Sequence, residues 1–517
     1  MEEIKSLTDI KKRFWEGRQF FLLAALLCLA VYFNALGGEF VSDDVSSIVE
    51  NPNLGNFFLA LKNFNVLNFS RAIIFHLFDR SVFAFHTFNL LLHLGTTVLV
   101  YFFILILTKN ERLSTLTSLL FALHPIHTEA VSWISGGGYV LYSFLLLLSF
   151  LFFHLYLEPE RNKTYLVFSL IFYVLSISSG IWAVPLLSLF FFYEVYLRQK
   201  KPSWLFYVVL VLFAAFGFYI NWKAGAVTGK IEAGASVGGT RNWTVTAPHS
   251  LVQYFYLLLW PLNLTIYHEG LKVSQNYVWL SRTAALLTIL ITPPILFWRK
   301  KKVALFFLLF FLASISLSLS PVKIGWYVAE RYLYLGSTSF CVLIAAILLW
   351  LEKKLPIKNL ALFLLIPILI FYSWRTFVRN NDWRTQASFW IATARDSPTS
   401  FRAWNNLGNV YGWEKKWDRA IEAYQQSLKI KPDHDTANFN LGIAYFSKGD
   451  LEAAKKYFLR TVQISPKHYR AFYNLGLISY KQGNSNEARR YWEQALHLNP
   501  NYDPARKGLS LLEEKGL

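Results

Sequence analysis

Four prolines recur at a constant interval near the end of this 517-residue chain: Pro398, Pro432, Pro466 and Pro500, each 34 residues after the one before. The positions between the prolines repeat at the same interval. They carry a leucine-glycine pair (Leu407-Gly408, Leu441-Gly442, Leu475-Gly476), an alanine (Ala420, Ala454, Ala488) and an aromatic residue (Tyr424, Phe458, Trp492). A period of this length predicts pairs of helices that stack on one another, with a proline closing each unit.

This pattern is the signature of the tetratricopeptide repeat, in which small residues allow close helix contact and aromatic residues fill the gaps. We predict three repeat units and a capping helix from about Pro504, so that the repeat domain covers 398–517. Asn406, Asn440 and Asn474 also lie 34 residues apart, on the face expected to line a concave groove. Amides at regular spacing can hydrogen-bond an extended peptide, but asparagine is equally common there for structural reasons.

The rest of the chain has the composition of a membrane protein. The sequence is 54% hydrophobic and 18% aromatic, and runs of about 20 apolar residues can each cross a hydrocarbon core of about 30 Å as a helix. We predict eleven spans, with 1–376 as a polytopic all-α domain and 377–397 as a connector. The spans are 19–36, 84–107, 113–124 with its continuation, 138–157, 164–178, 180–196, 204–222, 278–298, 303–319, 331–351 and 359–376. Trp260-Pro261 interrupts a further apolar stretch, 250–266, which we predict to be re-entrant.

The formal net charge of +19 has a specific distribution. The basic residues gather in short loops at 11–13, 109–112, 161–163, 198–201, 299–302 and 353–358. With eleven spans and a cytoplasmic N-terminus, all of these loops fall on one side, as the positive-inside rule requires. The charge therefore indicates topology, and a nucleic-acid partner is not expected. The repeats are expected on the opposite side, in the periplasm, lumen or extracellular space, where exported or surface polypeptides are available. From composition we expect the membrane to be a bacterial inner membrane.

Three polar motifs are predicted to lie at that outer side. The first is Asp43-Asp44 in the loop after the first span. Two adjacent carboxylates just outside a bilayer are candidates for a general base or a metal site, and their repulsion favours a raised pKa for one of them. The structural alternative is that one of them caps an interfacial helix.

The second motif is the stretch 124–129, which reads HPIHTE. Pro125 favours the first position of a helix, whose free N–H groups would face His124 and His127. Two imidazoles, the Glu129 carboxylate and a helix start would suit a phosphate, a pyrophosphate or part of a metal site, although the spacing fits no standard zinc motif. Buried structural histidines are the alternative.

The third motif is Glu330-Arg331, followed by Tyr332 and Tyr334. Arginine can bind a phosphate through two hydrogen bonds, and Glu330 can orient it. The alternative is an interfacial arginine within a belt of aromatic residues. Weaker candidates for the same pocket are Lys230, Arg241, His249, His268 and Glu269.

These motifs, in this order and followed by such repeats, resemble the transmembrane and tetratricopeptide-repeat-containing protein O-mannosyltransferases and their bacterial relatives. The likeness rests on Asp43-Asp44, on HPIHTEAVSW at 124–133, on VAERYLYL at 328–335 and on RNNDW at 379–383. It implies a glycosyltransferase of the GT-C architecture that moves a sugar from a polyprenyl-phosphate donor in the membrane to Ser/Thr hydroxyls of exported proteins. It also implies a catalytic acidic residue in the first loop, which would be Asp43 or Asp44.

In the mechanism that we expect from this resemblance, His124, His127 and Arg331 stabilise the departing phosphate, with Glu129 and Glu330 in the same donor site. A divalent metal held by Asp44, His127 or Glu129 is compatible with the sequence but not required by it.

The sequence departs from the family at two places. The family usually continues with Gly-Arg where this chain has Gly136-Gly137, and it carries Ser-Lys-Glu where 176–180 read SISSG. The loss of a cation would weaken donor binding, so two alternatives stay open. One is a noncatalytic membrane scaffold for envelope or secretion assembly, and the other is transfer to a lipid-linked or cell-wall glycan.

Overall fold

The computed structural model describes residues 4–159, 162–227, 243–268, 275–320, 326–355 and 357–515. These residues form two compact units, one reaching Thr385 and the other beginning at Gln386. Within the described residues both units are built from helices, which confirms the predicted all-α class. The segment predicted as a connector, 377–397, instead contains the end of helix α18 (Leu360–Asp382) and helix α19 (Gln386–Asp396).

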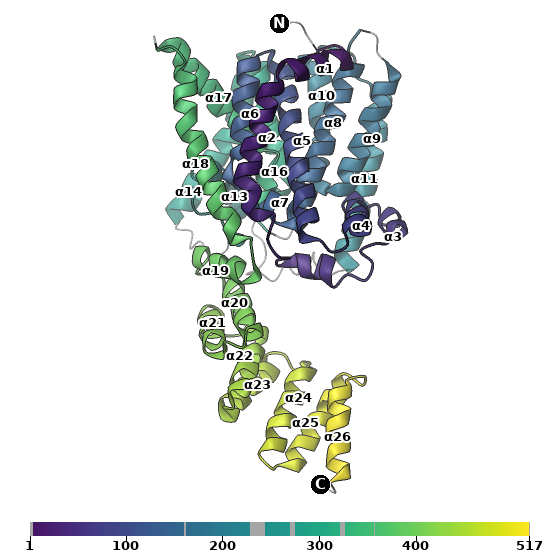
Figure 1. Ribbon diagram of the computed structural model, residues 1–517, viewed down its shortest axis with the longest axis vertical. Coiled ribbons are helices and arrows are strands. Elements are labelled where there is room, and N and C mark those ends of the chain that lie inside the picture. The colour runs from purple at the N-terminus through teal and green to yellow at the C-terminus, as the bar shows by residue number, and fades with distance from the viewer. Residues whose placement is uncertain are drawn as a thin grey trace. The chain divides into compact units, whose positions relative to one another are not determined.

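The first unit is a bundle of long apolar helices joined by short helical turns (Figure 1). In chain order its α-helices are α1 (Leu7–Glu16), α2 (Arg18–Tyr32), α3 (Phe57–Lys62), α4 (Val66–Phe78), α5 (Val82–Thr108), α6 (Glu111–Leu123), α7 (Thr128–Ser132), α8 (Gly137–Tyr156), α9 (Lys163–Ser179), α10 (Leu187–Phe192), α11 (Trp204–Val227), α13 (Trp243–Leu259), α14 (Gln275–Leu286), α15 (Thr292–Trp298), α16 (Lys302–Leu319), α17 (Ser337–Lys354) and α18. The short 3₁₀ and π elements are η1 (Phe33–Ala35), η2 (Val45–Val49), η3 (Pro125–His127), η4 (Ile134–Gly136), η5 (Ile181–Ala183), η6 (Tyr193–Leu197), η8 (Leu287–Ile291) and η9 (Glu330–Leu333).

The helices of the bundle are apolar on their outer faces as well as in the core. Leu22 of α2 and Phe363 of α18, for example, are 62% and 72% exposed. Six helices among the described residues are long and apolar enough to cross a membrane: 18–35, 82–108, 134–156, 279–298, 302–319 and 360–382. Apolar side chains on an outer face are stable in lipid and costly in water. The chain is therefore a multi-pass membrane protein, and the number of spans stays a prediction.

Of the stretch predicted to be re-entrant, 250–266, residues 250–259 form the second part of a continuous helix, and the rest is not helical. Helix α13 runs from Trp243 to Leu259 and ends directly before Trp260-Pro261. Its residues Leu257 and Leu258 are fully buried in the main core of the bundle. Because proline lacks an N–H group and restricts the residue before it, a helix normally ends at such a position.

Described residues of the basic loops contact neighbouring loops and helix ends. Arg112 binds Glu352 at the end of α17, with an N–O distance of 2.9 Å. Arg198 binds Glu158 at 2.6 Å, and Lys302 donates to the Tyr196 carbonyl at 3.4 Å. Figure 1 shows α1 at one end of this unit, whereas α3, α4 and α7 lie at the other.

The second unit contains the predicted repeats. Its helices are α19, α20 (Phe401–Trp413), α21 (Trp417–Ile430), α22 (Asp435–Lys448), α23 (Leu451–Ile464), α24 (Tyr469–Lys481), α25 (Ser485–Leu498) and α26 (Asp503–Glu514). Each repeat glycine lies against the aromatic ring of its own unit: Gly408 on Tyr424, Gly442 on Phe458 and Gly476 on Trp492. A Cβ atom at these positions would overlap the rings, which explains the small residue in every unit. The described helices of this unit include three pairs, α20–α21, α22–α23 and α24–α25, followed by α26.

Candidate functional site

The three polar motifs of the sequence meet at the end of the bundle that is remote from the basic loops. The Asp43-Asp44 loop follows α2, the 124–136 segment joins α6 to α8 through η3, α7 and η4, and Glu330-Arg331 begin η9. The RNNDW segment at the end of α18 ties these elements together. Asn380 donates to the Val31 carbonyl at 2.9 Å and accepts from Ser132 Oγ at 2.7 Å.

The two adjacent aspartates have different environments. Asp43 is exposed, whereas Asp44 is fully buried. The Asp44 carboxylate accepts hydrogen bonds from Ser135 N at 2.7 Å, from Ser135 Oγ at 2.5 Å and from Val41 N at 3.2 Å. Burial raises the pKa of Asp44 to about 6, although the Ser135 and Val41 hydrogen bonds and the charge of Arg71 oppose the rise. Asp44 therefore loses its proton at a pH closer to neutral than an ordinary aspartate does.

Trp133 connects the first loop to the third motif. Its indole Nε1 donates to the Val41 carbonyl at 3.3 Å. The Arg331 guanidinium lies over the ring of the same tryptophan, with 5.6 Å between the Arg331 Cζ atom and the ring centroid. The loop that presents Asp44 and the element that presents Arg331 therefore share one aromatic support.

Arg331 forms a buried ion pair with Glu129. Glu129 Oε1 accepts from Arg331 Nη1, and Glu129 Oε2 accepts from the Arg331 backbone N–H at 2.8 Å. The guanidinium also lies within 5.8 Å of the Tyr139 and Tyr332 ring centroids. Both ends of the pair are buried, so their charges largely neutralise one another at this position.

His124 and His127 are fully buried and hold neighbouring elements. As expected, Pro125 begins a helical turn, η3, whose Ile126 N–H donates to His124 Nδ1 at 3.2 Å. His124 Nε2 lies 3.2 Å from the Leu258 carbonyl, and His127 Nε2 lies 2.8 Å from Ser337 Oγ. These contacts join the motif to α13 and α17.

Glu330 is a buried carboxylate with incomplete partners. It is fully buried, and neither carboxylate oxygen has a hydrogen bond to any residue that the structure describes. His268 Nε2 and Arg379 Nη2 each lie 3.7 Å from Glu330 Oε1. Arg379 is itself bound to Asp382 at 2.9 Å. Glu330 and His268 therefore retain hydrogen-bonding capacity among charged side chains.

Gly137, where the resemblance leads us to expect an arginine, has no room for a side chain. A Cβ atom at Gly137 would overlap the side-chain amide of Asn89. Asn89 Nδ2 in turn faces the carbonyls of Val131, Trp133 and Ile134 at 3.2 to 3.4 Å. Glycine at this position therefore allows a buried amide to hold the turn between α7 and α8.

The three repeat asparagines lie on the first helix of each pair. Asn440 Nδ2 donates to Asn409 Oδ1 at 2.9 Å and to Asn405 Oδ1 at 3.3 Å, both on the preceding repeat. Asn406 accepts from Asn405 at 3.3 Å. Asn474 is 9% exposed and donates to the Arg470 carbonyl at 2.8 Å. The amides thus contribute to an internal ladder, in which Asn406 and Asn440 remain partly exposed.

Sequence reasoning missed several polar residues of the site. Ser135 follows HPIHTEAVSW directly, but nothing in the sequence pairs it with Asp44. Arg71 lies in α4 and is buried. The signal in the sequence was a single arginine within a largely apolar helix. Arg379 belongs to the RNNDW segment, which contributed to the resemblance without an assigned role. Lys230, Arg241 and Glu269 lie outside the described residues.

Within the part of the chain that the structure describes, no group of three or more His, Cys, Asp or Glu side chains is placed to hold a metal ion. Of the three residues considered as metal ligands, Glu129 binds Arg331 through both carboxylate oxygens and His127 binds Ser337. Asp44 accepts from Ser135 and Val41.

The C-terminal unit matches the family of tetratricopeptide repeats over residues 399–467 and again over 469–502. Among solved structures, the Sgt2 TPR domain from Aspergillus fumigatus is 25% identical, and the match covers 22% of this chain and 78% of that one, with a TM-score of 0.22.

Similarity to curated proteins extends over most of the chain. It is 26% identical to protein O-mannosyl-transferase F38B6.6 of Caenorhabditis elegans, over 81% of this chain and 64% of that protein. It is 23% identical to protein O-mannosyl-transferase TMTC3 of Homo sapiens, over 80% of this chain and 52% of that protein. It is 27% identical to protein O-mannosyl-transferase TMTC1 of Homo sapiens, over 81% and 56%. The chain thus spans between half and two thirds of the length of these relatives.

Proposed function

We propose that this chain is a membrane glycosyltransferase that transfers a sugar from a polyprenyl-phosphate donor to Ser/Thr hydroxyls of exported proteins. The similarity to protein O-mannosyl-transferases over about 80% of the chain supports the reaction class. The apolar helix bundle supports a donor that stays in the membrane. The active site lies at the end of the bundle opposite the basic loops, on the non-cytoplasmic side of a plasma membrane, which in a bacterium is the inner membrane.

The observation that carries this proposal is the buried Asp44 carboxylate. A general base works best when its pKa lies close to the operating pH, and burial raises the pKa of Asp44 to about 6. Ser135 fixes the carboxylate through two hydrogen bonds, so its orientation is set before substrate binds. Asp43 is the second candidate for this role, but it is exposed and lacks such support.

In the proposed reaction the acceptor hydroxyl oxygen attacks the anomeric carbon of the donor sugar. The bond between that carbon and the phosphate oxygen breaks, and polyprenyl phosphate leaves with the bonding electrons. Asp44 takes the proton of the hydroxyl. Attack from the face opposite the leaving group inverts the configuration at the anomeric carbon.

The donor phosphate is proposed to bind beside Arg331. Because Glu129 neutralises much of the Arg331 charge in this structure, the ion pair must loosen or share a hydrogen bond when phosphate binds. Glu330 and His268 retain hydrogen-bonding capacity next to it. His124 and His127 do not contact the phosphate in this proposal. They position η3 by binding α13 and α17.

The repeats are proposed to recruit the acceptor polypeptide. Asn406 and Asn440 are partly exposed on the first helices of their pairs. Side-chain amides can bond a peptide backbone whatever its side chains, which suits an enzyme that modifies many Ser/Thr sites.

The test is transfer of radiolabelled sugar from synthetic polyprenyl-phosphate mannose, glucose and N-acetylhexosamine to a Ser/Thr-rich peptide by the purified chain. We expect transfer from at least one donor, its loss in Asp44→Asn and its retention in Asp43→Asn. Loss in Asp43→Asn alone would assign the base to Asp43. No transfer from any donor by a folded chain would reject the enzyme and favour a noncatalytic scaffold, which the internal pairing of Glu129 with Arg331 also permits.

A further inference from the structure

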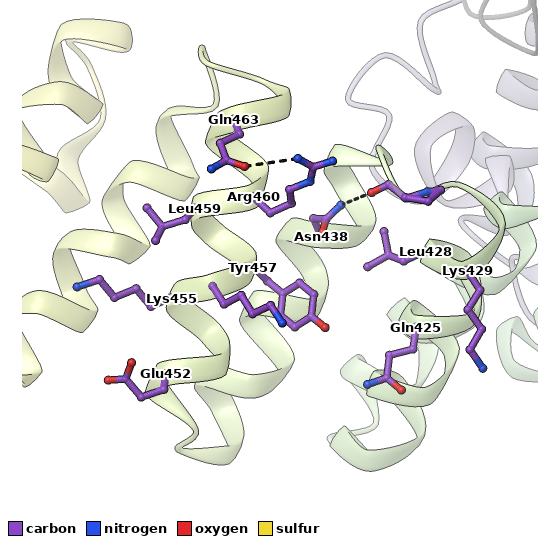
Figure 2. Close-up of a pocket in the computed structure, with 12 residues that line it drawn as sticks. Gln425, Leu428, Lys429, Asn438, Glu452, Lys455, Tyr457, Leu459, Arg460 and Gln463 are labelled. Carbon is purple, nitrogen blue, oxygen red and sulfur yellow. Dashed lines mark hydrogen bonds between the residues drawn. The ribbon is translucent and has the colours of Figure 1, made fainter.

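A groove separate from the repeat asparagines runs along the second helices of the first two repeat pairs. It has a volume of about 900 Å³ and lies between α21 and α23, and Asn438 of α22 and Pro432 also line it (Figure 2). We call it the α21–α23 groove. Ligand-binding clefts in proteins are commonly about 300–1,000 Å³, so the groove is large enough for several residues of a peptide. Asn406, Asn440 and Asn474 do not line it.

The charge in the groove is predominantly positive. Four cations, Lys429, Lys455, Lys456 and Arg460, line it together with a single acid, Glu452. Lys455 is bound to Glu487 at 3.2 Å, and Arg460 is bound to Asp433 at 2.6 Å.

The other two lysines in the groove are available to a ligand. Lys429 and Lys456 are exposed, and neither has an ion pair with any residue that the structure describes. They come from opposite walls, α21 and α23. An anionic ligand in the groove would therefore meet unneutralised charge on both sides.

Between the lysines the groove presents apolar and amide groups. Leu428 extends from α21 toward the groove, and Tyr457 of α23 lies on the wall that faces it, whereas Leu459 lines the groove from the side of α23 that carries Lys455 (Figure 2). The Tyr457 ring stacks on Tyr445 at a centroid distance of 5.6 Å, which holds it in place. Gln425 and Gln463 add side-chain amides that can bond a peptide backbone. A polyphosphate chain would use the cations alone, whereas a polypeptide would also use the leucines, the tyrosine ring and the amides.

We propose that the α21–α23 groove binds an extended acidic segment of a partner polypeptide. Acidic side chains of the segment pair with Lys429 and Lys456, and apolar side chains between them contact Leu428 and the Tyr457 ring. This partner site is independent of sugar transfer and of the asparagine face of the repeats. The repeat domain would therefore bind two different polypeptides, the acceptor and the acidic partner.

The test uses the full chain in nanodiscs of zwitterionic lipid, because anionic lipid would compete for the lysines. Binding of a fluorescein-labelled peptide that alternates Glu with Leu is measured by anisotropy, beside the isosteric peptide that alternates Gln with Leu. We expect the double variant Lys429→Glu/Lys456→Glu to weaken binding of the Glu peptide by at least about tenfold, since attraction at two positions becomes repulsion. Binding should also weaken as salt rises.

The matched control is Lys467→Glu/Lys507→Glu, which makes the same change in net charge at two exposed lysines outside the groove. It should bind the Glu peptide as the unmodified chain does. Equal weakening in both double variants would show general attraction to a basic protein and overturn the proposal. Equal affinity for the Glu and Gln peptides, or no binding of the Glu peptide, would do the same. Inorganic polyphosphate that binds more tightly than the Glu peptide, with the same dependence on Lys429 and Lys456, would replace the polypeptide with a phosphate polymer.

Discussion

Glu129 and Arg331, 202 residues apart in the chain, form a buried pair in which the carboxylate accepts from both the backbone N–H and the guanidinium of the arginine. This pair joins the segment between α6 and α8 to η9. It therefore fixes two of the three polar motifs relative to one another.

Removal of one partner of this pair should be costly. We expect Glu129→Gln to lower the free energy of unfolding by about 3–5 kcal/mol, because it leaves a buried guanidinium without a counter-charge. The double variant Glu129→Leu/Arg331→Met should recover most of that loss but not sugar transfer. The stability of the variants is compared by thermal unfolding in detergent. The control is Arg112→Gln at the exposed Arg112–Glu352 pair, which should change stability little. Glu129→Gln as stable as the unmodified chain would contradict this interpretation.

At low pH, the pH dependence of kcat/KM for the proposed sugar transfer should follow the ionisation of Asp44. Transfer needs the deprotonated carboxylate, so kcat/KM should rise with pH through an inflection at about 6. The ordinary pKa of an aspartate is 3.8, so folding favours the protonated form. This contribution to stability is fully present below about pH 4 and is lost as pH rises through about 6.

Ser135→Ala removes a hydrogen bond that lowers the pKa of Asp44, so the inflection should move to higher pH. Ser46→Ala is the control, since Ser46 Oγ donates to the Asp43 carbonyl and not to Asp44. If the inflection of kcat/KM in Ser135→Ala occurs at the same pH as in the unmodified chain, a group other than Asp44 causes it.

The repeats and most of the apolar helices could be predicted because their signals are local. Proline, glycine and aromatic residues recur at one period, and each packs within its own unit, as Gly442 does on Phe458. The length of an apolar run likewise predicts a helix without any knowledge of its neighbours. The extent of α13 was less predictable, since Trp260-Pro261 indicates where a helix ends but not where it begins.

The arrangement of the site depends on contacts between distant residues. Asp43 and Asp44 cannot be ranked from their neighbours in sequence, and Ser135, 91 residues away, is one of the residues that give them different environments. The orientation of His124 and His127 could not be predicted either, because the distant residues Leu258 and Ser337 bind their ring nitrogens. A sequence motif predicts which chemical groups are present, whereas their burial and partners come from the tertiary structure.

Gly137 should tolerate no side chain. We expect Gly137→Ala to lower the free energy of unfolding by about 1–3 kcal/mol, because the added methyl group displaces the Asn89 amide from its three carbonyl partners. Gly137→Arg, which places an arginine where the resemblance leads us to expect one, should destabilise the chain further and not raise transfer. Gly37→Ala is the control, as a Cβ atom there meets open space. Higher transfer by Gly137→Arg would show that the arginine finds room beside Asn89.

Asn440 offers a way to separate repeat stability from acceptor binding. Asn440→Ala removes two hydrogen bonds to the preceding repeat, so we expect a loss of about 1 kcal/mol in stability. If the amides also hold the acceptor, KM for a long Ser/Thr-rich peptide should rise several-fold while kcat stays the same. A very short acceptor that cannot reach the repeats should show no change in KM. Asn501→Ala, at an exposed turn before α26, controls for loss of an amide elsewhere in the unit. An unchanged KM for the long peptide in both Asn406→Ala and Asn440→Ala would leave these amides with a structural role only, and the acceptor would have to bind elsewhere.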